Sequence, residues 1–527
     1  MKRRFAVTIH EKYSTLLGAL FCSGIYVFDV VYMILFGRAY LDSDMAAEMI
    51  LSDLLNKSHS ILSENWYYST ELRVFEMQWL YRLGLLIFPN NWHLARLFGI
   101  SIALLLLAVC TYALGRLVLS RRDLPFWLAG LVLSPLCYRY FWFTIFGGYY
   151  IPYMVYSLLT IILLLRILKA GSRARRVLLC LPLCLIAFCS GLNGVRQLMV
   201  LYVPLLLACI ITRLRSKLFL PGFASFLFAT GGLLVNTKVL APRYHFRDYM
   251  QCAQWGNGTN SWLESLQQFF YSYGYYQDSH LGHYWDNPID LFSKRGIALG
   301  FGILAGIVVL IAFILVIRNY KELDSVKQFL VLCSLSMLFV IAFTFTYIMG
   351  APHYWIQTLV FGLLILCIAT EHLPIKKAGL PYLIPAFIAA IFVVSGAGIV
   401  KSSLNIPAHS SPDYEKVTDW ILENTDYTVG VSDFWNSDVI TELSNGKIDM
   451  YTITDLSQRP DASLLYTWLQ KVEHKDSFPT GNFFVLYPYH EDMSPYENAL
   501  SGYPASRIYD DGELVVYGVI STALASE

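Results

Sequence analysis

Charge is scarce in this sequence, and neither sign is in excess. Only 15% of the 527 residues are charged, with 39 Lys and Arg against 38 Asp and Glu, whereas soluble domains carry roughly a quarter charged residues. Without a basic excess, the chain lacks the long-range attraction that drives nucleic-acid binding. Hydrophobic residues make up 56% of the chain, and the mean hydropathy is +0.50. These values indicate a protein with lipid as its main solvent and no nucleic acid as a partner.

Cysteines are few, and their placement does not suit a disulfide framework or a metal site. Of the 10 cysteines, all but Cys252 fall inside apolar stretches, so Cys252 has no partner in an aqueous segment. We therefore expect neither a disulfide framework nor a CxxC metal site.

Apolar runs long enough to cross a bilayer, about 20 residues each, recur through the first part of the chain. The basic opening Met1–Phe5 is typical of a signal peptide, but no small-residue cleavage site follows the run Leu16–Phe36. We interpret this run as a retained first helix. In all we expect about eleven spans, at 15–37, 94–115, 124–145, 148–168, 176–192, 196–212, 217–237, 296–317, 327–349, 353–370 and 379–400.

Basic residues indicate how the spans are oriented, because cytoplasmic loops retain Lys and Arg whereas short outer loops do not. With the N-terminus inside, basic residues gather in the segments assigned to the cytoplasm, such as Arg116–Arg122 and Arg166–Arg176. The short outer turns hold only Arg196. We therefore expect a multi-pass protein of the cell membrane with a cytoplasmic N-terminus and an extracytoplasmic tail.

Three segments on the expected outer side are long and polar: the loops 38–92 and 238–295 and the tail 401–527. We expect a polytopic α-helical membrane domain at 1–400 and a small C-terminal extracytoplasmic α/β domain at 401–527, because strand-like and helix-like runs alternate in the tail. The expected strands are Tyr427–Ser432, Ile448–Ile453, Phe483–Tyr487 and Leu514–Val519, and the expected helices are Tyr414–Glu423, Asp438–Leu443 and Ser463–Val472.

Carboxylates cluster directly after the first span. Asp42 or Ser43 suits the N-cap of a new helix, in which Asp44 and Glu48 would lie at i and i+4 on one face. A carboxylate at the membrane surface can act as a general base on an acceptor hydroxyl, or help to hold a divalent cation against a phosphate. The pattern fits a capped helix with a solvated face equally well.

Six further ionisable residues are candidates for binding a sugar phosphate: Glu71, Arg73, Arg196, Arg243, His245 and Arg247. Guanidinium groups bind phosphate oxygens bidentately, and the aromatic residues near both long loops can stack against sugar rings. Each group also has a plainer interpretation. The first-loop pair fits a surface ion pair, the second loop fits an interface belt, and Arg196 fits a cation that snorkels from a helix end.

Two charges are predicted to lie deep within spans. Asp29 is about eight residues below the outer end of the first span, and Arg139 about seven below that of the third, so their depths match at 1.5 Å per residue. Because a lone charge in hydrocarbon is costly, we expect the two to pair or to face a polar cavity. Structural locking explains them better than catalysis does.

The acidic stretch Asp42-Ser43-Asp44 outside the first span, together with the long loop between the seventh and eighth spans, resembles the GT-C superfamily of membrane glycosyltransferases. The likeness is to the bacterial RgtA/B/C/D-like and protein mannosyltransferase-like groups, and it covers about residues 10–400. It implies transfer of a sugar from a polyprenyl-phosphate donor in the membrane lipid to a lipid-linked glycan or protein acceptor.

The resemblance also implies which residues take part. Asp44 would be the catalytic base, Asp42 its alternate or its orienting partner, and the loop Lys238–Arg295 would cover the donor. The chain lacks the adjacent Asp-Glu pair common in the family at this site, which leaves the assignment among Asp42, Asp44 and Glu48 open. Metal dependence varies within the superfamily, so no cofactor is assigned and a divalent cation stays an open alternative.

Two other functions compete with this one. A transporter or lipid flippase would explain many spans with buried charges, but its site would lie near the midplane between repeats, and the sequence shows no repeat. A non-catalytic envelope assembly protein would use its tail to bind partners. Release of polyprenyl phosphate from a labelled donor would separate the three.

Overall fold

The computed structural model describes residues 2–212, 214–246, 253–274, 292–373, 379–404 and 413–520. Its contacts divide the chain into two compact units. The first, here the membrane unit, comprises Met1–Val30, Ile102–Lys238 and Asp248–Ser403. The second, here the mixed unit, comprises Val31–Ser101, Val239–Arg247 and Leu404–Glu527. The mixed unit therefore joins the first long loop to the C-terminal tail, and the boundary near residue 400 stays a prediction.

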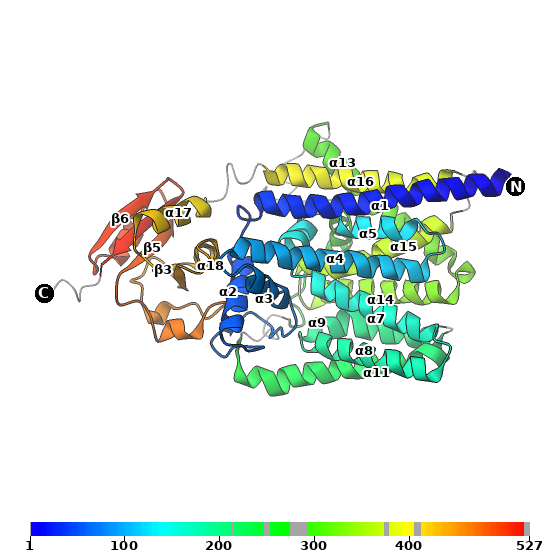
Figure 1. The fold of residues 1–527 in the computed structure, drawn as a ribbon, viewed down its shortest axis with the longest axis horizontal. Helices are drawn as coiled ribbons and strands as arrows, with labels where there is room; N and C mark the ends of the chain where they lie inside the picture. Colours follow the sequence, from blue (N-terminus) through cyan, green and yellow to red (C-terminus); the bar gives the residue numbers. More distant parts are fainter. Residues whose placement is uncertain are drawn as a thin grey trace. The chain divides into compact units, whose positions relative to one another are not determined.

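Nine helices in the described ranges are long and apolar enough to cross a membrane, which confirms a polytopic α-helical membrane protein. They contain or coincide with nine of the expected spans (Figure 1). These helices are α1 (Lys2–Phe36), α4 (Trp92–Val118), α7 (Ile151–Leu168), α8 (Arg173–Gly191), α11 (Arg215–Val235), α13 (Lys294–Arg318), α14 (Ser325–Tyr347), α15 (Leu359–Glu371) with the turn Pro352–Thr358 before it, and α16 (Leu380–Leu404).

The other two expected spans are broken helices. At 124–145, α5 (Leu124–Leu133) ends at Ser134, whose ψ of 142° is extended, because the proline that follows disfavours helical backbone before it. Short helical segments continue the path at Tyr138–Tyr140 and Phe141–Phe146. At 196–212, three short segments replace one helix: α9 (Val195–Gln197), a π-helical turn (Leu198–Tyr202) and α10 (Val203–Ile211).

Close backbone contact holds α8 against α11 in the membrane unit (Figure 1). A Cβ added to Gly191 would lie 2.0 Å from the carbonyl oxygen of Ala229, and one added to Gly232 would lie 2.1 Å from that of Phe188. Small residues that let helices approach are the usual basis of packing in lipid, where apolar burial gives little drive. The nine cysteines that the structure describes are all free.

The tail forms a five-stranded mixed sheet in the order β4-β3-β5-β7-β6, which confirms the expected α/β domain. β3 pairs in parallel with β4 and β5, while β7 pairs antiparallel with β5 and β6. The strands are β3 (Val429–Ser432), β4 (Asp449–Thr452), β5 (Phe483–Pro488), β6 (Ala505–Asp510) and β7 (Leu514–Val519). β6 was not predicted, because this edge strand, in which no residue is buried, has no apolar run to signal it.

Alternating side chains along β5 build a core on each face of the sheet. Phe483, Val485 and Tyr487 belong to one apolar cluster, and Phe484 and Leu486 to the other. The second cluster is covered by two helices, α17 (Tyr414–Asn424) and α18 (Phe434–Leu443), which lie beside the strands in Figure 1. This is the period-two pattern expected of a sheet buried on both faces.

The expected helix Ser463–Val472 is wrong. The chain there consists of short 3-10 turns at its two ends, a bend around Leu469, and a short stretch that pairs beside the free edge of β4. Leu465 bridges to Ile453, and the Tyr466 N–H donates to the Thr452 carbonyl at 2.9 Å. The open edge of a sheet offers unpaired backbone groups, and pairing with them replaces the helical hydrogen bonds.

The first long loop forms two helices, α2 (Ser43–Lys57) and α3 (Gln78–Ile87), and a short strand, β1 (Tyr67–Tyr68). β1 pairs in parallel with β2 (His245–Phe246). α2 packs on α3 on one side and on α18 of the tail on the other. The first-loop carboxylates and the C-terminal sheet therefore belong to one packed body.

Candidate functional site

α2 begins as the sequence predicts, with Asp42 as its N-cap. The Asp42 backbone is extended, and its carboxylate accepts a hydrogen bond from the Met45 N–H at 2.7 Å. Asp44 lies in the first turn, where a negative charge is favoured by the helix dipole. The Asp42 side chain therefore caps α2, while Asp44 and Glu48, at i and i+4, lie on one face of this helix.

Asp44 and Glu48 differ in exposure to solvent and in electrostatics. Asp44 lines an open cleft, whereas Glu48 Oε2 is shielded from solvent and has no hydrogen-bond partner among the described residues. Burial raises the pKa of Glu48 to about 7, opposed by Arg73 and Arg96 and assisted by Asp44. Burial also raises the pKa of Asp44, and the charge of Arg73 opposes it. The two carboxylates are therefore set up to hold protons at higher pH than ordinary acids.

Arg73 is the predicted residue that acts electrostatically on both carboxylates. Its Nε lies 3.9 Å from Glu71 Oε2, and Glu71 is only 7% exposed. A buried acid next to this guanidinium holds it in the interior, near Asp44 and Glu48. The plainer interpretation of Glu71 and Arg73 as an exposed surface pair does not fit this burial.

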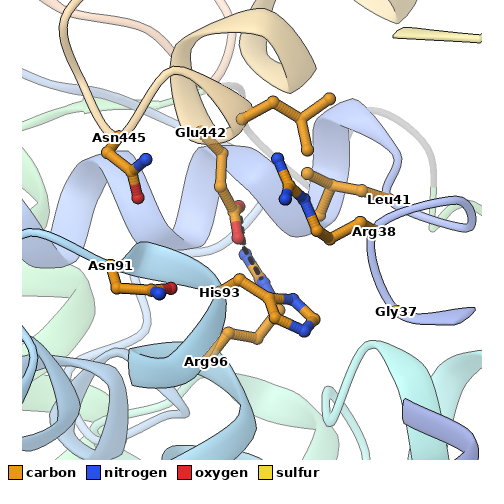
Figure 2. A pocket seen from close by; sticks show the side chains of 9 residues that line it. Gly37, Arg38, Leu41, Asn91, His93, Arg96, Glu442 and Asn445 are labelled. Carbon is orange, nitrogen blue, oxygen red and sulfur yellow. Dashed lines mark hydrogen bonds and ion pairs between the residues drawn. The ribbon is translucent and has the colours of Figure 1, made fainter. Parts of the chain in front are cut away.

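Arg96 and Glu442 form a second charged centre, which the sequence analysis missed. Arg96 Nε and Nη2 donate to the two carboxylate oxygens of Glu442 at 2.7 and 2.5 Å, and Nη2 also donates to the Met45 carbonyl at 2.7 Å. Figure 2 shows Glu442 reaching down from its helix to Arg96, beside a small cavity of about 110 Å³. This pair fixes the start of α2 and the end of α18 to α4.

α18 repeats the carboxylate spacing of α2, with Asp438 and Glu442 at i and i+4. Asp438 is 2% exposed, and its Oδ2 has no hydrogen-bond partner in the described part of the chain. Burial raises its pKa well above the ordinary range, and the charge of Asp44 adds to this. The i, i+4 spacing of these two acids within the expected helix Asp438–Leu443 is the sequence signal that could have identified them.

The cleft beside Asp44 has a volume of about 430 Å³. Its other walls come from the C-terminal sheet domain: Asp433, Phe434, Trp435, Ile453, Thr454, Tyr466 and Trp468. Four of these eight residues are aromatic, and both acids lie at the N-terminal ends of helices.

Three of the predicted binding residues belong to the second long loop: Arg243, His245 and Arg247. The His245 ring is 5.4 Å from the Tyr67 ring, next to the pairing of β1 with β2. Arg243 and His245 are exposed, and Arg247 lies outside the described residues. The contacts tie this segment to the first long loop, and the roles of these three residues in donor binding stay predictions.

In the membrane unit, Arg196 lies among tyrosine rings. Its guanidinium carbon is 5.4, 5.0 and 4.3 Å from the ring centres of Tyr150, Tyr153 and Tyr354. Nη1 also donates to the Tyr150 hydroxyl at 3.1 Å. Gly194, with a φ of 98°, makes the turn that places α9 here, a conformation that other residues rarely adopt. Cation–π contacts hold the guanidinium in a fixed orientation.

Asp29 and Arg139 do not pair, so the expected pairing is wrong, while the alternative that they face a polar cavity stays a prediction. Asp29 is fully buried, and neither carboxylate oxygen has a hydrogen-bond partner among the described residues. Arg139 Nη1 instead donates to Gln268 Oε1 at 2.8 Å. The equal depths assumed a continuous third span, whereas α5 ends at Leu133 and the helical rise no longer relates the two positions.

Two further observations concern metal binding and the membrane unit. Within the described ranges, no group of three or more His, Cys, Asp or Glu has an arrangement that could hold a metal ion. In the membrane unit, α12 (Trp262–Ser272), α13 and α14 enclose an apolar cleft of about 390 Å³. Its lining is almost wholly aliphatic and aromatic, including Phe269, Phe313 and Phe339.

No protein-family model matches the sequence, and no curated protein shows significant sequence similarity to it. The structure is similar to that of ArnT from Cupriavidus metallidurans bound to undecaprenyl phosphate, with a TM-score of 0.56 and 11% identity over 94% of this chain and 98% of that one. The apo state of the same protein gives a TM-score of 0.55 at the same identity and coverage. The archaeal oligosaccharyltransferase AglB from Archaeoglobus fulgidus, with an inhibitory peptide and a dolichol-phosphate, gives 0.49, with 10% identity over 95% of this chain and 74% of that one. Over nearly its whole length the chain therefore has the fold of ArnT, a GT-C glycosyltransferase, which confirms the expected resemblance at the level of the fold.

Proposed function

We propose that this protein is a membrane glycosyltransferase that moves a sugar from a polyprenyl-phosphate donor to an acceptor hydroxyl, with a carboxylate of α2 as the general base. The observation that carries the proposal is the position of Asp44, which opens onto a cleft beside the shielded Glu48. The fold supports it, since ArnT with this fold binds undecaprenyl phosphate.

The carboxylates of α2 divide the chemistry between them. Asp44 opens onto the cleft, and it accepts the proton as the acceptor hydroxyl attacks the anomeric carbon from the face opposite the phosphate. Glu48 lies one turn further along α2. Its pKa of about 7 keeps it mostly protonated below that pH, so it adds little negative charge next to Asp44. A base with a raised pKa binds the transferred proton more firmly than an ordinary aspartate. Asp42 shapes the site by capping the helix.

The donor needs a cation for its phosphate and an apolar surface for its chain. The leaving phosphate gains charge in the transition state, and a preorganised guanidinium offsets it. Arg196, which tyrosine rings hold in place, suits this task. The apolar cleft between α12, α13 and α14 offers aliphatic and aromatic walls of the kind that an isoprenoid chain buries against.

The test is release of polyprenyl phosphate from a labelled polyprenyl-phosphate sugar by the purified protein in lipid nanodiscs. Asp44→Asn should lower the rate about 100-fold or more, the usual range for loss of a general base, without lowering the yield of folded protein. Asp53→Asn is the matched control, because Asp53 pairs with Lys57 on the same helix and nine residues turn it to the opposite face. The proposal fails if the wild-type protein releases no polyprenyl phosphate from any donor offered, or if Asp44→Asn and Asp42→Asn both keep full activity.

A further inference from the structure

The cleft beside Asp44 is formed almost entirely by the C-terminal sheet domain, and its lining is not that of a phosphate site. Of the eight described residues around it, seven belong to the tail and none is Lys or Arg. The two charged groups are the carboxylates of Asp44 and Asp433. An anionic ligand would contact no basic side chain in this lining and would meet two carboxyl groups.

Aromatic side chains form the other part of the lining. The Trp435 side chain is 62% exposed, unusual for a residue that normally buries most of its surface. Its ring centre lies 5.1 Å from that of Phe434, which lies 5.8 Å from that of Tyr466. An exposed indole beside a set of packed aromatic rings offers a flat apolar face, while its N–H and the nearby carboxylates offer polar contacts.

The cleft is rigidly built. Asp433 caps α18, and its Oδ1 accepts hydrogen bonds from the Asn436 backbone and side-chain amides at 3.1 and 2.6 Å. The segment with Tyr466 is fixed to the edge of β4, where the Thr454 N–H donates to the Leu464 carbonyl at 2.8 Å. These bonds hold a carboxylate and an aromatic ring of the lining in place before any ligand arrives.

We infer that this cleft, here the acceptor cleft, binds an uncharged carbohydrate as the acceptor of the transfer, with a ring stacked on Trp435 and hydroxyls bonded to Asp433 and Asp44. The inference rests on the proposed function, because it places an acceptor hydroxyl at the carboxylate taken as the base. Sugar hydroxyls donate well to carboxylates, and the C–H face of a pyranose suits an aromatic face. The volume of about 430 Å³ is within the range of small-ligand clefts and has room for one or two sugar rings.

The inference is tested by direct binding, which needs no donor. The probes are neutral tetrasaccharides of glucose, mannose, galactose and N-acetylglucosamine, observed by saturation-transfer NMR on the full chain in nanodiscs. At least one should bind saturably, and Trp435→Ala should weaken it about tenfold, the loss of one well-packed aromatic contact. Trp435→Phe should keep part of the affinity. Trp420→Ala, which removes an indole that packs on Tyr509 elsewhere in the same domain, should leave it unchanged.

Donor hydrolysis separates the two proposals. Without acceptor, the wild type and the control Trp420→Ala should both release polyprenyl phosphate slowly to water. If no tetrasaccharide binds, or if binding does not depend on Trp435, while donor turnover is intact, the acceptor cleft is refuted and the proposed function stands. Binding of an acidic phospholipid or a peptide through Trp435 in place of the sugars would also overturn it. If sugars bind through Trp435 but no donor is ever turned over, the cleft is supported as a carbohydrate site and the transferase proposal fails.

Discussion

Arg96 and Glu442 are 346 residues apart in the sequence and form a bidentate ion pair with side chains only 5% and 4% exposed. The two N–H groups of one guanidinium edge meet both oxygens of one carboxylate, a geometry that strengthens the contact and fixes its direction. A third contact, from Arg96 to the Met45 carbonyl at 2.7 Å, brings the first turn of α2 into the same network. The first loop and the tail are thus joined beside the proposed base.

Breaking this pair on one side should destabilise the mixed unit strongly. Glu442→Gln or Arg96→Met leaves a buried charge without its partner, which typically costs about 3–5 kcal/mol. Thermal unfolding of the purified protein should show a clear fall in Tm for each single variant. The double variant Arg96→Met with Glu442→Leu should recover most of that loss, because two apolar groups replace the pair without an orphaned charge.

The exposed pair Arg507 with Asp510, whose side chains are 39% and 35% exposed, is the matched control for this test. Asp510→Asn should change the free energy of unfolding by about 1 kcal/mol or less, as is usual for surface pairs. Equal effects of Glu442→Gln and Asp510→Asn would mean that the Arg96 pair does not bind the tail to the first loop.

The sequence predicted the local features of the site and missed the long-range ones. A capping residue followed by acids at i and i+4 is a local pattern, and it correctly predicted α2 with Asp44 and Glu48 on one face. Arg96 lies within the expected span 94–115, and nothing near it in the sequence indicates Glu442. Only packing of α18 on α2 brings the two together, and a single sequence does not encode which helices meet.

Two wrong predictions, the helix at Ser463–Val472 and the pairing of Asp29 with Arg139, have separate physical causes. The run Ser463–Val472 has helix-like spacing, but the backbone of Leu465 and Tyr466 pairs with the open edge beside β4 instead of forming a helix. The pairing of Asp29 with Arg139 assumed an unbroken helix across Pro135. In the first case a tertiary contact with an open sheet edge outweighed the local pattern, and in the second the proline itself ends the helix.

Asp42 and Asp44 should respond differently to the same substitutions. Asparagine caps helices about as well as aspartate, so Asp42→Asn should keep both stability and activity, whereas Asp42→Ala should cost about 1 kcal/mol of stability. Asp44→Asn should keep stability and lose activity, measured by donor turnover alongside Tm. If Asp42→Asn abolishes turnover without lowering Tm, the base is Asp42 and the assignment must be reversed.

The stability of the mixed unit should fall as pH rises through the titration of Glu48. Burial raises the Glu48 pKa in the folded protein from the ordinary 4.5 to about 7. The folded state therefore keeps a proton that the unfolded chain releases at lower pH, so the stabilisation is complete below about pH 4.5 and is lost between there and about 7. Glu48→Gln should remove this loss, which is on the order of 1–3 kcal/mol. Tm measured at pH 5 and pH 7.5 should thus fall less in Glu48→Gln than in the wild type.

Glu64→Gln, which alters an exposed carboxylate of the same loop, is the control and should leave the difference between the two Tm values unchanged.

The turnover rate should rise with pH, whereas the stability falls, because a base acts only when ionised. The rate should rise with pH up to the raised pKa of Asp44. Above about pH 7 the wild-type Glu48 ionises and its charge opposes ionisation of Asp44, so Glu48→Gln should give the higher rate there. A pH profile identical in the two proteins would show that Glu48 does not act on the base.

Arg196 should control the affinity for the donor if its guanidinium binds the leaving phosphate. A hydrogen bond to a charged group is worth about 1.5–3 kcal/mol, so Arg196→Gln should raise the donor KM about 10- to 100-fold. Arg196→Lys should recover only part, because lysine lacks the planar fork. Tyr354→Phe keeps the ring that lies 4.3 Å from the guanidinium and should stay close to wild type, whereas Tyr354→Ala should be intermediate. Arg166→Gln, at the exposed end of α7, controls for loss of a positive charge. A donor KM within twofold of wild type in Arg196→Gln would exclude Arg196 from the phosphate site and leave it as an anchor for the tyrosines around it.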